Sequence, residues 1–160
     1  MNKVNGKKTS FAPIREDGSR ITICYGLKKL SKDLYEWFEV YLPKKHLSQL
    51  TFADVKAAII ADIDERVKAQ IIGGMIWNDK PVWYSIENQL NFTNATAPVT
   101  LKIGEQEDGT PIYEDFETEE QLTDFRTACN NHKQVALSAG WQEKDGIDWA
   151  PYEECFKVEE

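Results

Sequence analysis

Aromatic, amide and carboxylate side chains gather in one stretch of the chain, residues 76–92, with the sequence IWNDKPVWYSIENQLNF. Such residues can line a sugar-binding site, where the ring supplies an apolar face and the amides supply hydrogen bonds. The same residue types also form ordinary core packing followed by the polar start of a helix. The residues in question are Trp77, Trp83, Tyr84, Ser85, Glu87, Asn88, Gln89 and Asn91.

The polar residues of this stretch match the start of a short helix, which we expect over residues 86–95. Ser85 is a favoured N-cap residue, and Glu87 in the first turn suits the positive end of the helix dipole. A hairpin with a three-residue turn, NDK at residues 78–80, is expected just before it. We therefore interpret the polar residues as a structural cluster that bonds the turn or neighbouring strand ends: Ser85, Glu87, Asn88, Gln89 and Asn91.

The aromatic residues have two interpretations. Packing against the apolar sides of the helices is the simpler one. Alternatively, one face of a strand leaves one or two rings exposed as a binding surface. An earlier predicted strand, LYEWFEVYL, carries further aromatics on one side. The candidate interaction surface consists of Trp77, Trp83, Tyr84, Trp37 and Tyr35.

Motifs of catalysis are missing from the sequence. His46 and His132 are the only histidines, and neither has a partner at the spacing of a zinc site. There is no nucleophile elbow, P-loop or dinucleotide fingerprint. A pair of catalytic carboxylates is the one enzyme mechanism that the sequence does not exclude. A glycosidase needs two acids about 5–9.5 Å apart, and Glu87 near the tryptophans is a candidate for one of them. We expect a protein that is not an enzyme and holds no cofactor or metal.

Hairpins alternate with capped helices along the chain, which predicts an α+β fold with antiparallel sheets, two long helices and one short one. Thr51 with Asp54 and Thr118 with Gln121 are predicted helix starts, and Gly140 is a predicted C-cap. The expected elements are a hairpin over 19–42, a helix over 52–70, a hairpin over 71–85, a helix over 86–95, a hairpin over 98–117 and a helix over 118–140.

A length of 160 residues suits one compact domain. We expect residues 1–13 to be a flexible N-terminal arm and residues 14–160 to be a single α+β domain. Within it, the N-terminal hairpin over 19–42 precedes a helix–hairpin–helix–hairpin–helix body over 50–141. Residues 142–160 are expected to form an acidic tail that packs partly and then frays.

The net charge of −8 is unevenly distributed along the chain. Residues 1–60 hold 11 Lys/Arg and 6 Asp/Glu, a balance of +5, and the remaining residues hold 8 and 21, a balance of −13. Solvated surface explains this, but a two-faced molecule could also pack head-to-tail on copies of itself. Nucleic-acid binding is disfavoured because the chain is acidic overall.

Cys24, Cys129 and Cys155 are far apart and odd in number, so we expect free thiols in a reducing compartment. No apolar run approaches the roughly 20 residues of a membrane span, and no signal peptide is recognisable. We expect a soluble protein made in the cytoplasm of a host cell, with the virion tail as a possible final location, and no membrane partner.

Five segments together resemble a domain family of phage and prophage tail-fibre and tail-fibre-assembly proteins, in the version found in prophages of Bacteroides-type gut bacteria. They are VKAAIIADIDERV, IIGGMIWNDKPVWYSIENQLNF, PVTLKIG, FETEEQLTDF and GWQEKDGIDW, and they cover about residues 50–150. The resemblance implies a tail-associated protein, either a fibre accessory module or a chaperone for fibre assembly. It implies other tail proteins, or copies of the chain itself, as partners, and no catalytic residues. The alternatives are a carbohydrate-binding module that uses exposed tryptophans and a carboxylate-based hydrolase of cell-wall glycans.

Overall fold

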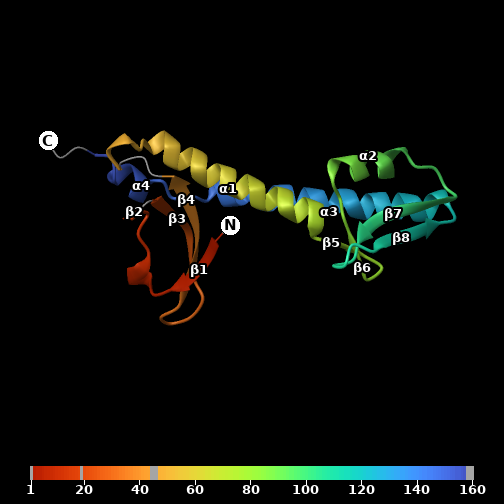
Figure 1. The fold of residues 1–160 in the computed structure, drawn as a ribbon, viewed down its shortest axis with the longest axis horizontal. Coiled ribbons are helices and arrows are strands. Elements are labelled where there is room, and N and C mark those ends of the chain that lie inside the picture. Colours follow the sequence, from red (N-terminus) through yellow and green to blue (C-terminus); the bar gives the residue numbers. More distant parts are fainter. Residues whose placement is uncertain (1, 19, 44–46, 158–160) are drawn as a thin grey trace. The chain divides into compact units, whose positions relative to one another are not determined.

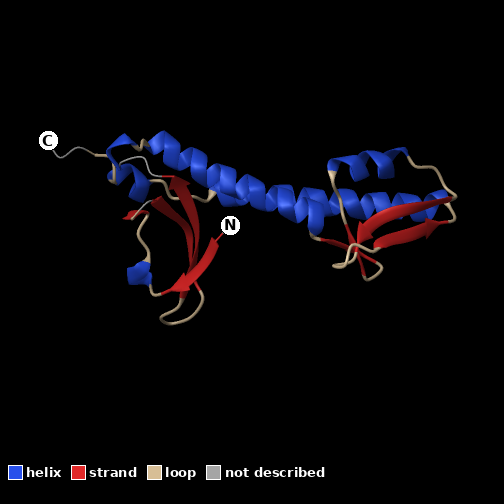
Figure 2. Ribbon diagram, viewed as in Figure 1, coloured by secondary structure: helices blue, strands red, loops and turns tan. Residues whose placement is uncertain are grey.

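The computed structural model describes residues 2–18, 20–43 and 47–157. The chain folds as two compact units, each with helices and antiparallel strands (Figure 2), so the predicted α+β class is confirmed. Residues 1–64 and 142–160 make up the first unit, and residues 65–141 the second. The expectation of a single domain over 14–160 therefore does not match the contacts, because the two long helices each divide their length between two separate cores.

The first unit holds a four-stranded antiparallel sheet in the order β1-β4-β3-β2 (Figure 1). Its strands are β1 (Asn2–Gly6), β2 (Ile14–Asp17), β3 (Arg20–Lys29) and β4 (Tyr35–Pro43), with 3-10 turns at Lys8–Ser10 and Leu47–Gln49. The flexible arm expected over 1–13 is wrong for residues 2–6, because β1 pairs with β4 from Asn2↔Glu39 to Gly6↔Tyr35. The predicted hairpin is the central pair, β3 and β4.

One face of this sheet packs on the start of helix α1 (Phe52–Gly73). Ile21, Ile23 and Tyr25 alternate along β3 and are fully buried, and the Tyr25 hydroxyl donates to Asp62 of α1 at 2.5 Å. Helix α1 buries Val55, Ile59 and Ile63, which recur every four residues as predicted. Its predicted start is confirmed, because the Thr51 hydroxyl accepts from the Asp54 N–H at 3.2 Å and Asp54 accepts from the Thr51 N–H at 2.9 Å.

A carboxylate is buried on the other face of the same sheet. Glu39 is 5% exposed and accepts hydrogen bonds from Arg15 at 2.8 Å, from the Trp37 indole at 3.1 Å and from the Tyr41 hydroxyl at 2.9 Å. A buried charge must be paired and hydrogen-bonded to be tolerated, and three donors meet that need. The Cys24 thiol lies beside this group, opposite Glu39 in the strand register.

The second unit contains β5 (Met75–Trp77), β6 (Lys80–Val82), α2 (Ile86–Asn94), β7 (Val99–Glu105) and β8 (Pro111–Phe116), together with the end of α1 and most of α3 (Glu119–Asp145). Phe125 of α3 is central to its core, with ring centroids 5.3 Å from Trp77, 5.0 Å from Phe92 and 5.0 Å from Phe116. The predicted cap of α3 is confirmed, since the Thr118 hydroxyl accepts from the Gln121 N–H and the Gln121 side chain accepts from the Thr118 N–H, both at 3.3 Å.

Three local predictions in this unit are wrong. The hairpin expected over 71–85 is shorter, because residues 71–73 belong to α1. The β5–β6 turn has two residues rather than three, because Asn78 and Asp79 both adopt positive φ and Trp77 pairs with Lys80. Gly140 is no C-cap, because α3 continues to Asp145. Gly140 is instead buried against α1, where a Cβ atom would stand 2.4 Å from Cγ2 of Val67.

The predicted acidic tail is more ordered than expected over residues 142–157. Its first residues complete α3, and α4 (Ala150–Glu154) follows within the first unit. The buried Tyr152 hydroxyl donates to the Cys24 carbonyl of β3 at 2.7 Å, which anchors α4 to the sheet. The end of the tail, residues 158–160, lies outside the described residues, so the expected fraying is not tested there.

Candidate functional site

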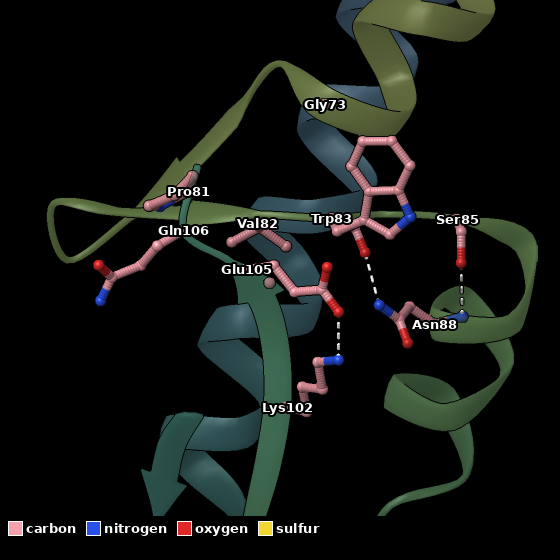
Figure 3. Close-up of a pocket in the computed structure, with 10 residues that line it drawn as sticks. Gly73, Pro81, Val82, Trp83, Ser85, Asn88, Lys102, Glu105 and Gln106 are labelled. Carbon is pink, nitrogen blue, oxygen red and sulfur yellow. Dashed lines mark hydrogen bonds and ion pairs between the residues drawn. The ribbon is translucent and has the colours of Figure 1, made fainter. Parts of the chain in front are cut away.

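A groove of about 550 Å³ opens on the second unit beside Trp83 (Figure 3). Trp83 follows β6, and its side chain is 55% exposed. The groove takes its walls from the end of α1, from β6, from the start of α2 and from β7 with the loop after it. Its lining includes Gly73, Pro81, Trp83, Asn88, Lys102 and Gln106.

A bulge in β7 positions Trp83. The register of β7 against β8 shifts between Lys102 and Gly104, so Ile103 is the additional residue on β7. The carbonyl of Ile103 accepts from the N–H of Trp83 at 2.7 Å. Gly104 permits this approach, because a Cβ atom there would lie 2.3 Å from the carbonyl oxygen of Pro81. The strands β6 and β7 thus meet where only glycine fits.

The start of α2 holds Trp83 from its other side. The side-chain amide of Asn88 donates to the carbonyl of Trp83 at 2.6 Å, while the N–H of Asn88 donates to the hydroxyl of Ser85 at 3.3 Å. Both backbone polar groups of Trp83 are therefore bonded within the unit. Figure 3 shows the ring between the end of α1 at Gly73 and the start of α2 at Asn88. The backbone that carries the exposed ring is therefore fixed on both sides, which lowers the entropy that ordering this segment on binding would cost.

Charged and amide groups form the rim of the groove on the side of β7. Lys102 and Glu105 pair with each other, and their side chains remain 46% and 55% exposed. Gln106 continues the rim and is exposed. These groups are within reach of solvent, so the groove offers one aromatic surface with a donor, a carboxylate and an amide beside it.

The five aromatic candidates are separated by burial. Trp83 is exposed, whereas Trp37 is 3% and Tyr84 5% exposed, and Trp77 and Tyr35 are half-buried. Tyr84 stacks on Phe92 with the ring planes 10° apart. Trp37 and Tyr35 belong to the first unit, and Trp77, Trp83 and Tyr84 belong to the second. Packing explains Trp37, Trp77 and Tyr84, and Trp83 alone of the five presents an exposed ring.

The polar candidates occupy the start of α2. Ser85 is the N-cap, as predicted. Gln89 donates to the Tyr84 carbonyl at 3.1 Å and accepts from Lys133 of α3 at 2.9 Å, while Asn91 is exposed. Hydrogen bonds from its own backbone N–H, and then from the Ser85 hydroxyl, lower the pKa of Glu87. Asn88 and Gln89 bond the ends of the preceding strand segment, as the helix-start interpretation predicts.

Sequence reasoning missed the part of the groove that β6 and β7 contribute: Pro81, Lys102, Gly104, Glu105 and Gln106. One signal was available, because a glycine inside an apolar strand often marks a bulge or a close backbone approach.

The described residues offer little evidence for metal binding or for a nucleophilic cysteine. They contain no group of three or more His, Cys, Asp or Glu side chains that could hold a metal ion. His132 is half-buried on α3, with its Nε2 2.8 Å from the Gln70 carbonyl oxygen of α1, and His46 lies outside the described residues. Burial raises the pKa of the Cys24 thiol to about 11 and that of Cys129 to about 12. Both thiols are therefore poor nucleophiles at neutral pH.

Comparison with protein-family models, curated proteins and solved structures finds no match. Among the described residues, none of the helices has both the length and the apolar character needed to span a membrane.

Proposed function

We propose that this chain is a non-enzymatic protein of a phage or prophage tail, serving as a fibre accessory module or as a chaperone for fibre assembly. In this proposal it holds its partner through the groove beside Trp83. The observation that carries the binding role is the 55% exposed indole on a backbone that is bonded from both sides. Tryptophan is among the residue types most enriched at the positions that dominate binding energy. The assignment to a tail rests on the resemblance of residues 50–150, a range that includes the whole groove.

The experiment that tests this function is affinity capture during co-expression. The tagged chain is produced together with the tail proteins encoded beside its gene, and the material that co-purifies is identified. Retention of a fibre or fibre-adjacent protein at a fixed ratio supports the proposal. Recovery of the chain alone, from cells in which every tail protein is present and soluble, contradicts it.

A carbohydrate-binding module is the second candidate, and the composition of the groove favours it. The flat ring of Trp83 can cover the apolar face of a sugar, while Lys102, Glu105 and Gln106 lie beside it to meet hydroxyl groups. A glycan array separates the two functions. Saccharide binding that is lost with Trp83→Ala, without capture of a tail protein, would replace the first function by the second.

A glycan hydrolase receives less support from this site. The general acid of a glycosidase needs a raised pKa, whereas the pKa of Glu87 is lowered by its own backbone N–H and by the Ser85 hydroxyl. Glu87 also lies outside the lining of the groove. Clearing of peptidoglycan by the wild-type chain, abolished in Glu87→Gln, would overturn this assessment.

A further inference from the structure

A compact basic loop on the first unit carries two exposed leucines. Residues 28–34 connect the paired ends of β3 and β4, and all of them are exposed. The N–H groups of Leu30 and Ser31 donate to the Leu34 carbonyl at 2.9 and 3.1 Å, so the loop has a defined shape. Leu30 is 44% and Leu34 41% exposed. The two leucines make this loop a small apolar patch rimmed by cations, and apolar patches with a polar rim occur at contact surfaces.

The charge of this loop is largely uncompensated. It holds three lysines and one aspartate. Lys28 lies 3.7 Å from Glu36, a carboxylate that is also paired with Lys3 at 2.8 Å. Within the part of the chain that the structure describes, Lys29 and Lys32 make no ion pair. The loop thus presents apolar side chains surrounded by positive charge.

A groove with the opposite character is present on the second unit. It measures about 670 Å³ and lies between the β5–β6 turn and the β7–β8 loop. Apolar side chains in its lining are Pro81, Pro111 and Ile112, and its acids are Asp79, Glu107 and Asp108. Lys80, its cation, is already paired with Glu114. Hydrogen bonds from the backbone N–H and then the side chain of Thr110 lower the pKa of Asp108.

We propose that the loop of residues 28–34 docks into this acidic groove on a second copy of the chain. Leucines would meet prolines and Ile112, and lysines would meet the three carboxylates. A second copy is the occupant because the chain itself holds both halves of the match. The second unit carries 6 Lys/Arg and 12 Asp/Glu, so its field attracts a basic loop. This contact adjoins the groove beside Trp83, with which it shares Pro81 and Gln106, and it does not depend on the tail function.

The loop and the groove are different surfaces, so the interface is heterologous and every copy has one of each. A heterologous interface generates a ring where the rotation closes and a filament where it does not. The chain is therefore expected to form assemblies that grow with concentration beyond the dimer.

Light scattering and sedimentation of the full chain test this directly. The average mass is expected to rise above the 18.4 kDa of one chain with increasing concentration at low salt. At 1 M salt, where the screening length is about 3 Å, association should weaken by at least about tenfold. A chain that stays monomeric up to millimolar concentration at low salt overturns the proposal.

Neutral variants locate the contact. Lys28→Gln, Lys29→Gln and Lys32→Gln together remove the charge of the loop, and Asp79→Asn, Glu107→Gln and Asp108→Asn together remove that of the groove. Asparagine tolerates the positive φ of Asp79 and can still accept the Thr110 bond at position 108. Each triple variant alone should be monomeric, but their mixture should form a dimer that cannot grow, because only one loop and one groove remain intact.

Matched substitutions elsewhere complete the design. Lys68→Gln with Lys157→Gln, and Glu65→Gln with Asp124→Asn, change exposed charges outside both surfaces and should leave the association unchanged. Leu30→Ala removes apolar contact without changing charge and should also weaken the association, since the loop is closed by backbone bonds. Association that survives in both triple variants, or a mixture that grows beyond two copies, contradicts the proposed pairing.

Discussion

The backbone N–H of Trp83 donates to the carbonyl of Ile103 across 2.7 Å, although the two residues belong to different strand segments of different hairpins. This bond exists because β7 bulges at Ile103 and because Gly104 lets Pro81 approach. It holds the exposed indole at the mouth of its groove. The position of the ring therefore depends on Gly104, a residue that has no side chain of its own.

Gly104→Ala is the change that tests this dependence. The new Cβ atom would stand 2.3 Å from the Pro81 carbonyl oxygen, so the strands must separate. We expect a loss of about 1–3 kcal/mol in the free energy of unfolding, by analogy with overpacking in cores, and a shift in the fluorescence of Trp83. Urea denaturation measures the first effect. Gly73→Ala is the control, because its Cβ atom would lie 3.6 Å from the Trp83 ring, an ordinary contact.

A second close approach joins α1 to α3 inside the second unit. Gly140→Ala places a methyl group 2.4 Å from Cγ2 of Val67 and should destabilise the unit by about 1–3 kcal/mol. Val67→Ala removes the clashing methyl group, so the double variant should lose less stability than the sum of the single variants. Denaturation of all four proteins in a double-mutant cycle measures the coupling. Additive effects would show that the two side chains do not collide.

The pairs and caps that lie close together in the sequence could be predicted, whereas the long-range ones could not. Thr51, Ser85 and Thr118 form their caps within a few residues, and these were expected. Strand β1 was missed because it is polar, and its pairing with β4 depends on partners 29 to 37 residues away. Gly140 was mistaken for a helix end because a glycine that ends a helix and one that lets two helices approach look alike in one sequence.

Within the site, the exposure of Trp83 could likewise be predicted from the sequence only in part. Alternation along the segment places Val82 and Tyr84 on one side and Trp83 on the other, which the sequence indicates. Which side faces water is decided by the Phe125 core and by the bulge in β7, and neither can be read from residues 76–92. The bonds of Asn88 and Gln89 to the preceding strand segment could be predicted because they are local.

The buried carboxylate of Glu39 makes the first unit sensitive to acid. Burial opposes its ionisation, but hydrogen bonds from Trp37, Tyr41 and Arg15 together outweigh burial and lower its pKa below the ordinary value of 4.5. A lowered pKa in the folded state means that this stabilisation is complete above pH 4.5 and is lost as the pH falls through the folded value. Glu39→Gln should cost about 1–3 kcal/mol at pH 7 and flatten the decline of stability below pH 4.5. Urea titrations at pH 7 and below 4.5 measure both effects, and Glu65→Gln should change neither.

The three thiols are expected to differ in reactivity. Cys155 is exposed, whereas Cys24 and Cys129 are buried with raised pKa values. An aromatic disulfide reagent at pH 8 should titrate one thiol of the folded chain rapidly and all three in urea. Cys155→Ser should abolish the rapid reaction. Rapid reaction of two thiols in the folded protein would show that one of the two cores opens readily.

The binding role of the groove is tested most directly by comparing two exposed tryptophans of the second unit. Trp83 is 55% and Trp141 54% exposed, but only Trp83 lines the groove. The measurement is the amount of tail protein that co-purifies with Trp83→Ala and with Trp141→Ala, at equal yield and equal stability of the two variants. We predict a loss of at least about tenfold for Trp83→Ala, as for a residue that dominates an interface, and wild-type recovery for Trp141→Ala. Equal recovery of the partner by both variants would contradict the assignment of the groove as the binding surface.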